Sequence, residues 1–138
     1  MNKKLIFGIV DDDDIYRYTI QRTIRDLDLS EKNLIFTNGE QALQFLLDHT
    51  DSAGELPDVL LLDVNMPIMD GFEFMKEYEN IASNLVKKIV IFMISSSVNP
   101  VDIDRAKNFP GITDYIVKPI EPGKLQRIIS ELDWHGLV

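Results

Sequence analysis

Two groups of carboxylates in this chain follow directly after runs of apolar residues. Asp63 follows the apolar run 59–62, and four successive aspartates at residues 11–14 follow the apolar run 5–10. Such runs are typical of buried strands in a parallel sheet, which deliver the residues after them to one edge, where ligands bind. Carboxylates from two strand ends can surround a hard divalent cation, and that cation can neutralise a phosphoryl group. The spacing therefore predicts a metal-assisted site for phosphoryl chemistry.

Composition limits the classes of protein to which this chain can belong. Its 138 residues are enough for one domain with a buried core, and 45% are hydrophobic and 27% charged. The absence of cysteine excludes disulfides and suits a reducing cytosol, so we expect a cytoplasmic protein. A net charge of −9 disfavours nucleic acid as a partner. Only six apolar residues follow Lys3 and Lys4, which is too few for a signal peptide or a membrane span.

Strand-like and helix-like segments alternate along the chain, which favours βαβ units around a parallel sheet. The predicted strands are 5–10, 33–37, 59–62, 89–94 and 113–117. Between them, apolar residues recur with the 3.6-residue period of an amphipathic helix, beginning with Tyr16, Ile20 and Ile24. The sequence therefore predicts an α/β fold, a doubly wound five-stranded parallel sheet with five helices.

Residues that favour helix N-termini stand at the expected starts of four helices. They are Asp13 with Asp14, Asp70, Asn99 before Pro100, and Glu121 before Pro122. The fourth helix is the weakest prediction, because Val101, Ile103 and Ala106 give little amphipathicity and segment 108–111 ends it early. We expect Trp134, after the last helix, to pack the tail back onto the body.

The chain resembles the receiver domain of bacterial two-component response regulators, and it does so over essentially its whole length. Five landmarks carry the resemblance, in chain order: the pair Asp11 and Asp12, segment 63–71, the hydroxyl of Ser95, the ring of Tyr115, and Lys118 with Pro119. Each landmark falls at a predicted strand end. The resemblance implies a flavodoxin-like sheet with strand order 2-1-3-4-5, in which strands one and three are neighbours. It also implies a single stand-alone receiver domain over residues 1–138, without an output domain, similar to chemotaxis regulators.

The resemblance implies that Asp63 is a phosphoacceptor and that Mg²⁺ is the cofactor. The implied metal ligands are Asp12 directly, Asp11 through water, Asp63, and the backbone carbonyl of Asn65. A carboxylate can form an acyl-phosphate, and the transfer needs mostly positioning and charge neutralisation. Two plainer interpretations stay open. Residues 11–14 can be a solvated acidic run at a helix start, and Asp63 can be a turn-initiating residue.

Three further residues complete the site that the resemblance implies. Lys118 supplies a positive charge, and the family's cis Lys-Pro bond before Pro119 turns this lysine into the site. Ser95 donates its hydroxyl to a phosphoryl oxygen, and Tyr115 is the switch residue whose position follows that movement. The plainer alternatives are a polar loop over residues 95–97 and ordinary core packing for Tyr115.

Two other classes of protein compete with this interpretation. Asp11 and Asp13, one residue apart after the first strand, resemble the nucleophile motif of haloacid-dehalogenase-type Mg²⁺-dependent phosphatases. Such enzymes need a second acidic pair at a later strand end, where this chain has Ser95 and Lys118. The other alternative is a non-phosphorylated interaction module on the same fold. It would be favoured if acidic or acceptor positions were missing, and they are all present.

The resemblance also implies the partners. A sensor histidine kinase or a histidine phosphotransfer protein would donate the phosphoryl group, and a downstream protein would read the signal by contact. The chain would then be a signalling domain that assists its own phosphorylation and dephosphorylation, not an enzyme, with no nucleic-acid or membrane partner. Segment 108–112 departs from the Gly-Ala pair that is common in the family, which leaves the geometry of the output face open.

Overall fold

The computed structural model describes residues 4–134. Its five strands are β1 (Leu5–Val10), β2 (Ser30–Phe36), β3 (Val59–Asp63), β4 (Val90–Ser95) and β5 (Ile112–Val117). Its helices are α1 (Asp14–Asp26), α2 (Gly39–Asp48), α3 (Gly71–Ile81), the short 3₁₀ helix η1 (Ala82–Asn84), α4 (Pro100–Lys107) and α5 (Pro122–Trp134). All strand pairs are parallel, in the order β2-β1-β3-β4-β5. The predicted fold class and strand order are confirmed.

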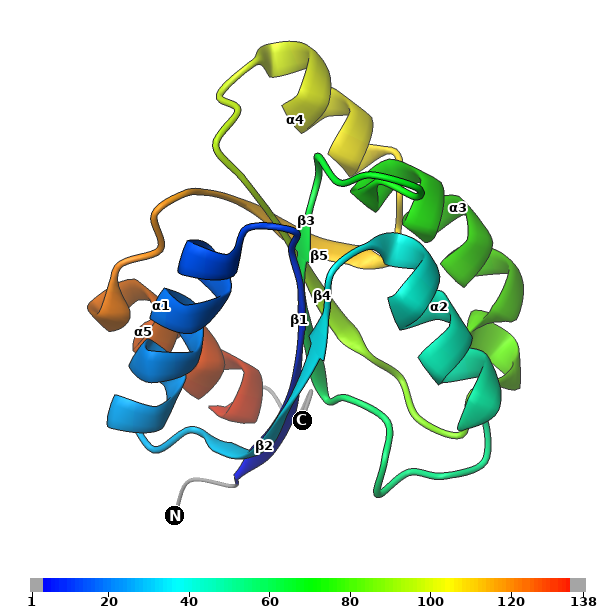
Figure 1. The fold of residues 1–138 in the computed structure, drawn as a ribbon, viewed down its shortest axis with the longest axis horizontal. Helices are drawn as coiled ribbons and strands as arrows, with labels where there is room; N and C mark the ends of the chain where they lie inside the picture. Colours follow the sequence, from blue (N-terminus) through cyan, green and yellow to red (C-terminus); the bar gives the residue numbers. More distant parts are fainter. Residues whose placement is uncertain (1–3, 135–138) are drawn as a thin grey trace.

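Helices cover both faces of the sheet, which explains why its strands are apolar without alternation (Figure 1). Helices α1 and α5 lie on one face, and α2, α3 and α4 lie on the other. Along β3, Val59 and Leu61 point into the core beneath α1 and α5, whereas Leu60 and Leu62 point into the core beneath α2 and α3. Because both faces of β3 are buried, every one of its positions is hydrophobic until Asp63.

All four predicted helix starts are confirmed, since α5 also begins at Pro122, and side-chain caps are seen at the other three. Asp13 caps α1 by accepting from the backbone N–H groups of Ile15 and Tyr16. Asp70 caps α3 in a reciprocal capping box with Glu73. At α4, Asn99 accepts from Val101 N–H, with Pro100 at the first helical position, and the helix ends at Lys107, as expected from the stop signals after it. These caps satisfy backbone donors that a helix leaves unpaired at its N-terminus.

The strand boundaries differ from the prediction mainly in β2. This strand begins at Ser30, three residues before the predicted start, and pairs with β1 at the edge of the sheet. Its first residues are polar and only partly buried, so their hydrophobicity does not reveal the strand. The expected packing of Trp134 concerns a side chain outside the described part of the structure. Within residues 4–134, no helix is both long and apolar enough to span a membrane.

Candidate functional site

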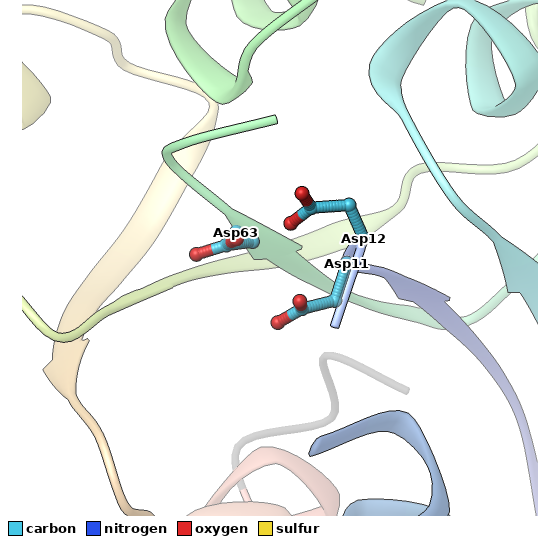
Figure 2. Close-up of side chains that lie close together, drawn as sticks. All are labelled: Asp11, Asp12 and Asp63. Atoms are coloured by element: carbon cyan, nitrogen blue, oxygen red, sulfur yellow. The ribbon is translucent and has the colours of Figure 1, made fainter. Parts of the chain in front are cut away.

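Three carboxylates converge at the carboxyl edge of the sheet (Figure 2). Asp11 and Asp12 directly follow β1, and Asp63 is the last residue of β3. Because Val10 of β1 lies opposite Leu62 of β3, the residues that follow them emerge side by side. One carboxylate oxygen from each of the three aspartates lies within 4.8 Å of the others. Asp11 and Asp63 are buried and Asp12 is exposed, so the cluster opens to solvent on the Asp12 side.

Lys118 brings a positive charge to these carboxylates from the end of β5. Its Nζ donates to Asp11 Oδ2 at 2.8 Å and lies 3.4 Å from Asp63 Oδ1. Its backbone N–H donates to the Ser95 carbonyl at 2.8 Å, which ties it to β4. The Lys118–Pro119 peptide bond is cis, as the resemblance implied. Burial alone lowers the pKa of Lys118, but the contacts with Asp11 and Asp63 outweigh it and raise the pKa, so the ammonium stays charged.

The electrostatic balance of the site is negative. Burial first, and then the charge of Asp11, raises the pKa of Asp63 from 3.8 to about 6, although Lys118 opposes this rise. Three carboxylates facing one ammonium would leave an excess of two negative charges when all are ionised. A divalent cation with oxygen coordination would balance that excess. The donor set therefore fits Mg²⁺, the metal that the resemblance implied.

Asp11 is held on both of its carboxylate oxygens. Oδ1 accepts from the backbone N–H of Asp13 at 2.9 Å, and Oδ2 accepts from Lys118. Arg17 adds a hydrogen bond from Nη1 to the Asp11 carbonyl at 2.6 Å. Asp13 itself caps α1, the role predicted for it, and it stands apart from the cluster of three carboxylates. The carboxylates in segment 11–14 thus divide between the site and the helix start.

A tight turn after β3 packs against the backbone of Asp63. A Cβ atom added at Gly71 would lie 2.4 Å from the Asp63 carbonyl oxygen, so only glycine fits there without a shift. The Gly71 N–H donates to the Val64 carbonyl at 2.8 Å, which closes the turn. Asn65 is exposed in this turn, two residues beyond Asp63.

Ser95 and Tyr115, the predicted switch residues, are connected through Ser97. Ser95 is fully buried at the end of β4, and its Oγ accepts from the Ser97 N–H at 3.0 Å. The Tyr115 hydroxyl donates to the Ser97 carbonyl at 2.9 Å. The Ser97 hydroxyl in turn donates to Asp102 of α4 at 2.8 Å. One residue of the β4–α4 loop therefore contacts the predicted phosphoryl sensor, the predicted aromatic switch and a helix.

Sequence reasoning placed Tyr16 on the inner face of α1 but did not assign it to the site. The ring of Tyr16 lies over the Lys118 ammonium, with 4.2 Å between Nζ and the ring centroid. Burial, followed by the charges of Asp11 and Asp63, raises the pKa of Tyr16, so its hydroxyl stays protonated. Ser97 was also missed as a connecting residue. Neither role has a sequence signature. A helical core position has the same pattern whether or not its ring contacts a lysine, and a serine-rich loop has the same pattern whether or not one serine connects its neighbours.

Comparison with protein families decides the identity of this arrangement. The family described as the response regulator receiver domain matches residues 7–130, which include all the predicted site residues. The chain belongs to this family. It is therefore a signalling domain of two-component systems, as the landmarks at the strand ends predicted. The alternative of a haloacid-dehalogenase-type phosphatase is not favoured, and Asp13, which that alternative needs in the site, caps a helix instead.

Individual relatives agree with the family match. The probable methanogenesis regulatory protein FilR2 of Methanothrix harundinacea is 25% identical over 96% of this chain and 83% of its own length. The cyclic di-GMP phosphodiesterase response regulator RpfG of Xanthomonas campestris is 33% identical over 90% of this chain. The receiver domain described here spans only 30% of RpfG, and 14% of the sensor histidine kinase CheAY of Helicobacter pylori.

Solved structures show the same fold. A two-component response regulator from Cytophaga hutchinsonii superposes with a TM-score of 0.82 at 25% identity, covering 94% of this chain and 98% of that one. The chemotaxis protein CheY4 of Vibrio cholerae gives a TM-score of 0.75 at 26% identity, covering 94% of this chain and 98% of that one. Both matches extend over nearly the full length of the receiver domain.

Proposed function

We propose that Asp63 is the residue of this receiver domain that accepts a phosphoryl group, with Mg²⁺, from a histidine kinase or a histidine phosphotransfer protein. The observation that carries the proposal is the position of Asp63. It is a buried carboxylate at the end of β3, 3.4 Å from an ammonium and within 4.8 Å of two further carboxylates. Asp11 is also buried beside the same ammonium and carboxylates, but each of its carboxylate oxygens already accepts a hydrogen bond, from the Asp13 N–H and from Lys118.

The chemistry is a transfer in which Asp63 is the nucleophile. One carboxylate oxygen of Asp63 forms a bond to phosphorus while the bond between phosphorus and the donor atom breaks, and the electron pair leaves with the donor. Lys118 faces the oxygen of Asp63 and neutralises negative charge on the phosphoryl group. Bound Mg²⁺ would neutralise the charge of the phosphoryl oxygens and of the carboxylates. Because the transition state is loose, correct placement of these charges accounts for most of the catalysis.

The residues that would hold Mg²⁺ differ in how freely they can bind it. Asp12 is exposed beside the cluster and is the proposed direct ligand. Asp11 already accepts a hydrogen bond on each oxygen, which supports a contact through water. Asp63 and the backbone carbonyl of Asn65 would complete the protein ligands. Mg²⁺ retains several waters in its octahedral shell, so this number of ligands is sufficient.

Intact mass spectrometry after incubation with Mg²⁺ and acetyl phosphate tests the assignment of Asp63. We expect one added phosphoryl group that is lost on treatment with hydroxylamine, as an acyl-phosphate should be. Asp63→Asn should take up none. Asp70→Asn is the matched control, because Asp70 lies in the same turn but caps α3, and it should be phosphorylated like the wild type. An undiminished phosphoryl mass in Asp63→Asn would reject the assignment.

A pair of variants tests the metal ligands. Asp12→Asn should weaken Mg²⁺ binding in calorimetric titration more than Asp13→Asn does, because only Asp12 belongs to the carboxylate cluster. Asp13→Asn keeps a side-chain oxygen for capping α1. If Asp13→Asn were the weaker binder, the metal would use Asp11 and Asp13, and the dehalogenase-like pairing would regain support.

We further propose that the signal is read through protein contact at the face formed by α4, β5 and α5, and not by turnover of a substrate. Ser95 and Lys118 lie at the ends of the two strands beside α4 and α5, so a phosphoryl group held by both would act on that face. A partner can use the change only if its affinity differs between the two states. The lack of cysteine fits a reducing compartment, and we therefore propose that this signalling takes place in the cytoplasm.

Hydrogen exchange with beryllofluoride in place of the phosphoryl group tests this output. Exchange rates should change from Asp63 through residues 95–120, and Ser95→Ala should reduce the change. Changes confined to the metal site would show that the domain stores a phosphoryl group without switching its surface.

A further inference from the structure

The ammonium of Lys118 is contacted from three sides, and only two of them are carboxylates. Asp11 Oδ2 accepts its hydrogen bond at 2.8 Å, Asp63 Oδ1 lies at 3.4 Å, and the ring of Tyr16 covers a third side at 4.2 Å. A cation over the face of an aromatic ring is attracted by the negative charge density of that face. The ring is therefore part of the surroundings that hold the ammonium in place.

Helix α1 fixes the position of the Tyr16 ring. Tyr16 lies in the first turn of α1, and its backbone N–H is bound by the capping residue Asp13. The ring packs against the core beneath α1 and α5, which includes Ile20 and Ile24. It therefore approaches Lys118 from a helix whose start is attached to the acidic segment, and its freedom of movement is small.

The ring, and not the hydroxyl, makes the contact with the site. The Tyr16 hydroxyl is buried and has no hydrogen-bond partner within residues 4–134, whereas the ring face contacts the ammonium. The contributions of the ring and the hydroxyl can therefore be tested separately, because phenylalanine keeps the ring face and removes only the unpaired hydroxyl. Leucine removes the face while leaving an apolar side chain in the core.

A lysine has a flexible stem, so its ammonium needs neighbours that define where it points. Asp63 changes its own charge distribution when it takes a phosphoryl group, whereas the Tyr16 ring stays the same before and after. We propose that Tyr16 is a positioning residue, whose ring directs the Lys118 ammonium toward the phosphoryl group on Asp63. The inference rests on the proposed function, in which Asp63 accepts that group.

Phosphorylation by acetyl phosphate with saturating Mg²⁺ tests the inference without a protein partner. Tyr16→Leu should lower the rate constant about fivefold, the effect of losing one cation–π contact at a partly desolvated site. Tyr16→Phe should restore the rate to within about twofold of the wild type. Tyr18→Leu is the matched control, because Tyr18 is an exposed tyrosine on the same helix and should have no effect. If Tyr16→Leu fails to fold by circular dichroism, Tyr16→Met gives the same test with a flexible side chain.

A double-mutant cycle with Lys118→Ala separates positioning from a general loss of packing. If Tyr16 acts through Lys118, adding Tyr16→Leu to Lys118→Ala should cause no further loss of rate. An equal loss in both backgrounds, or a Tyr16→Leu rate equal to the wild type, would overturn the inference while leaving the role of Asp63 intact. Failure of the wild type to take up phosphate, or full phosphorylation of Asp63→Asn, would instead reject the proposed function and this inference with it.

Discussion

Asp63 is surrounded by groups with opposing effects on its charge. Burial and the neighbouring Asp11 favour the neutral carboxylic acid, while Lys118 favours the carboxylate, and the net result is a pKa of about 6. A divalent cation bound beside this carboxyl group would stabilise its ionised form, because the cation would offset the repulsion between the carboxylates. The ionised Asp63 therefore lowers the free energy of unfolding in the absence of metal, and the same residue is the proposed phosphoacceptor.

The raised pKa of Asp63 predicts how stability depends on pH in the absence of metal. Because the folded state binds this proton more tightly than the unfolded state, the free energy of unfolding should fall as pH rises from about 3.8 through about 6. Relative to Asp63→Asn, which stays neutral, the wild type should lose on the order of 2 kcal/mol over that range. Urea denaturation with a chelator present, at a series of pH values, measures the difference.

Saturating Mg²⁺ is the control for this pH dependence. Metal binding favours the ionised carboxylate, so the loss of stability between these pH values should shrink or disappear for the wild type. Parallel stability curves for the wild type and Asp63→Asn without metal would contradict the prediction.

At the scale of elements, the turn between β3 and α3 positions the site by close packing. Gly71→Ala would press a methyl group into the Asp63 carbonyl oxygen, which lies 2.4 Å from the new Cβ. We expect a loss of about 1–3 kcal/mol in the free energy of unfolding and slower phosphorylation, because the backbone of Asp63 must move. Gly54→Ala is the control, since nothing lies within 4 Å of its added Cβ. A Gly71→Ala variant as stable and active as Gly54→Ala would show that the turn adapts freely.

In the β4–α4 loop, the hydroxyl of Ser97 should stabilise the start of α4. Ser97→Ala removes the hydroxyl that donates to Asp102 and accepts from the Asn99 N–H, but keeps the backbone contacts with Ser95 and Tyr115. Loss of these bonds should weaken the start of α4 by about 1 kcal/mol, seen as faster amide exchange in α4. Ser96→Ala changes the exposed neighbour and should leave the exchange unaltered. Unchanged exchange in Ser97→Ala would show that the helix start does not depend on this hydroxyl.

Local sequence patterns specified most elements but not all of their boundaries. Asp13, Asp70 and Asn99 were predictable as caps, because a side-chain acceptor before a helical pattern has a local effect on backbone N–H groups. The start of β2 at Ser30 was not predictable in the same way. Its first residues are held by backbone hydrogen bonds to β1, and such bonds leave no hydrophobic pattern at an exposed edge.

For the whole molecule, the sequence indicated the residues of the site better than their contacts. Asp11, Asp63 and Lys118 were predictable because each follows an apolar strand, and parallel strands deliver such residues to one edge. The contact of Tyr16 with Lys118 was not predictable, since it joins residues 102 positions apart in the chain. This contact depends on how α1 is placed over the sheet. The 3.6-residue pattern of α1 shows only that Tyr16 faces inward, and that pattern is the same whether the ring contacts a methyl group or an ammonium.

Because the candidate site is distributed over the ends of β1, β3 and β5, the proposed binding of Mg²⁺ would depend on the whole fold. The unfolded chain separates Asp12 from Asp63, so Mg²⁺ should bind the folded state almost exclusively and stabilise it by mass action. At about one hundred times the dissociation constant, the gain is about 2.7 kcal/mol, which should raise the melting temperature by several degrees.

Thermal unfolding with and without Mg²⁺, at matched ionic strength, measures this gain. The increase should be largely lost in Asp12→Asn, whereas Asp13→Asn should retain it, because Asp13 stands outside the carboxylate cluster. Without metal, Asp12→Asn should melt at or above the temperature of the wild type, since it removes one of three repelling carboxylates. An equal increase with Mg²⁺ in the wild type and Asp12→Asn would show that the cation stabilises the acidic chain nonspecifically, and not through the ends of these strands.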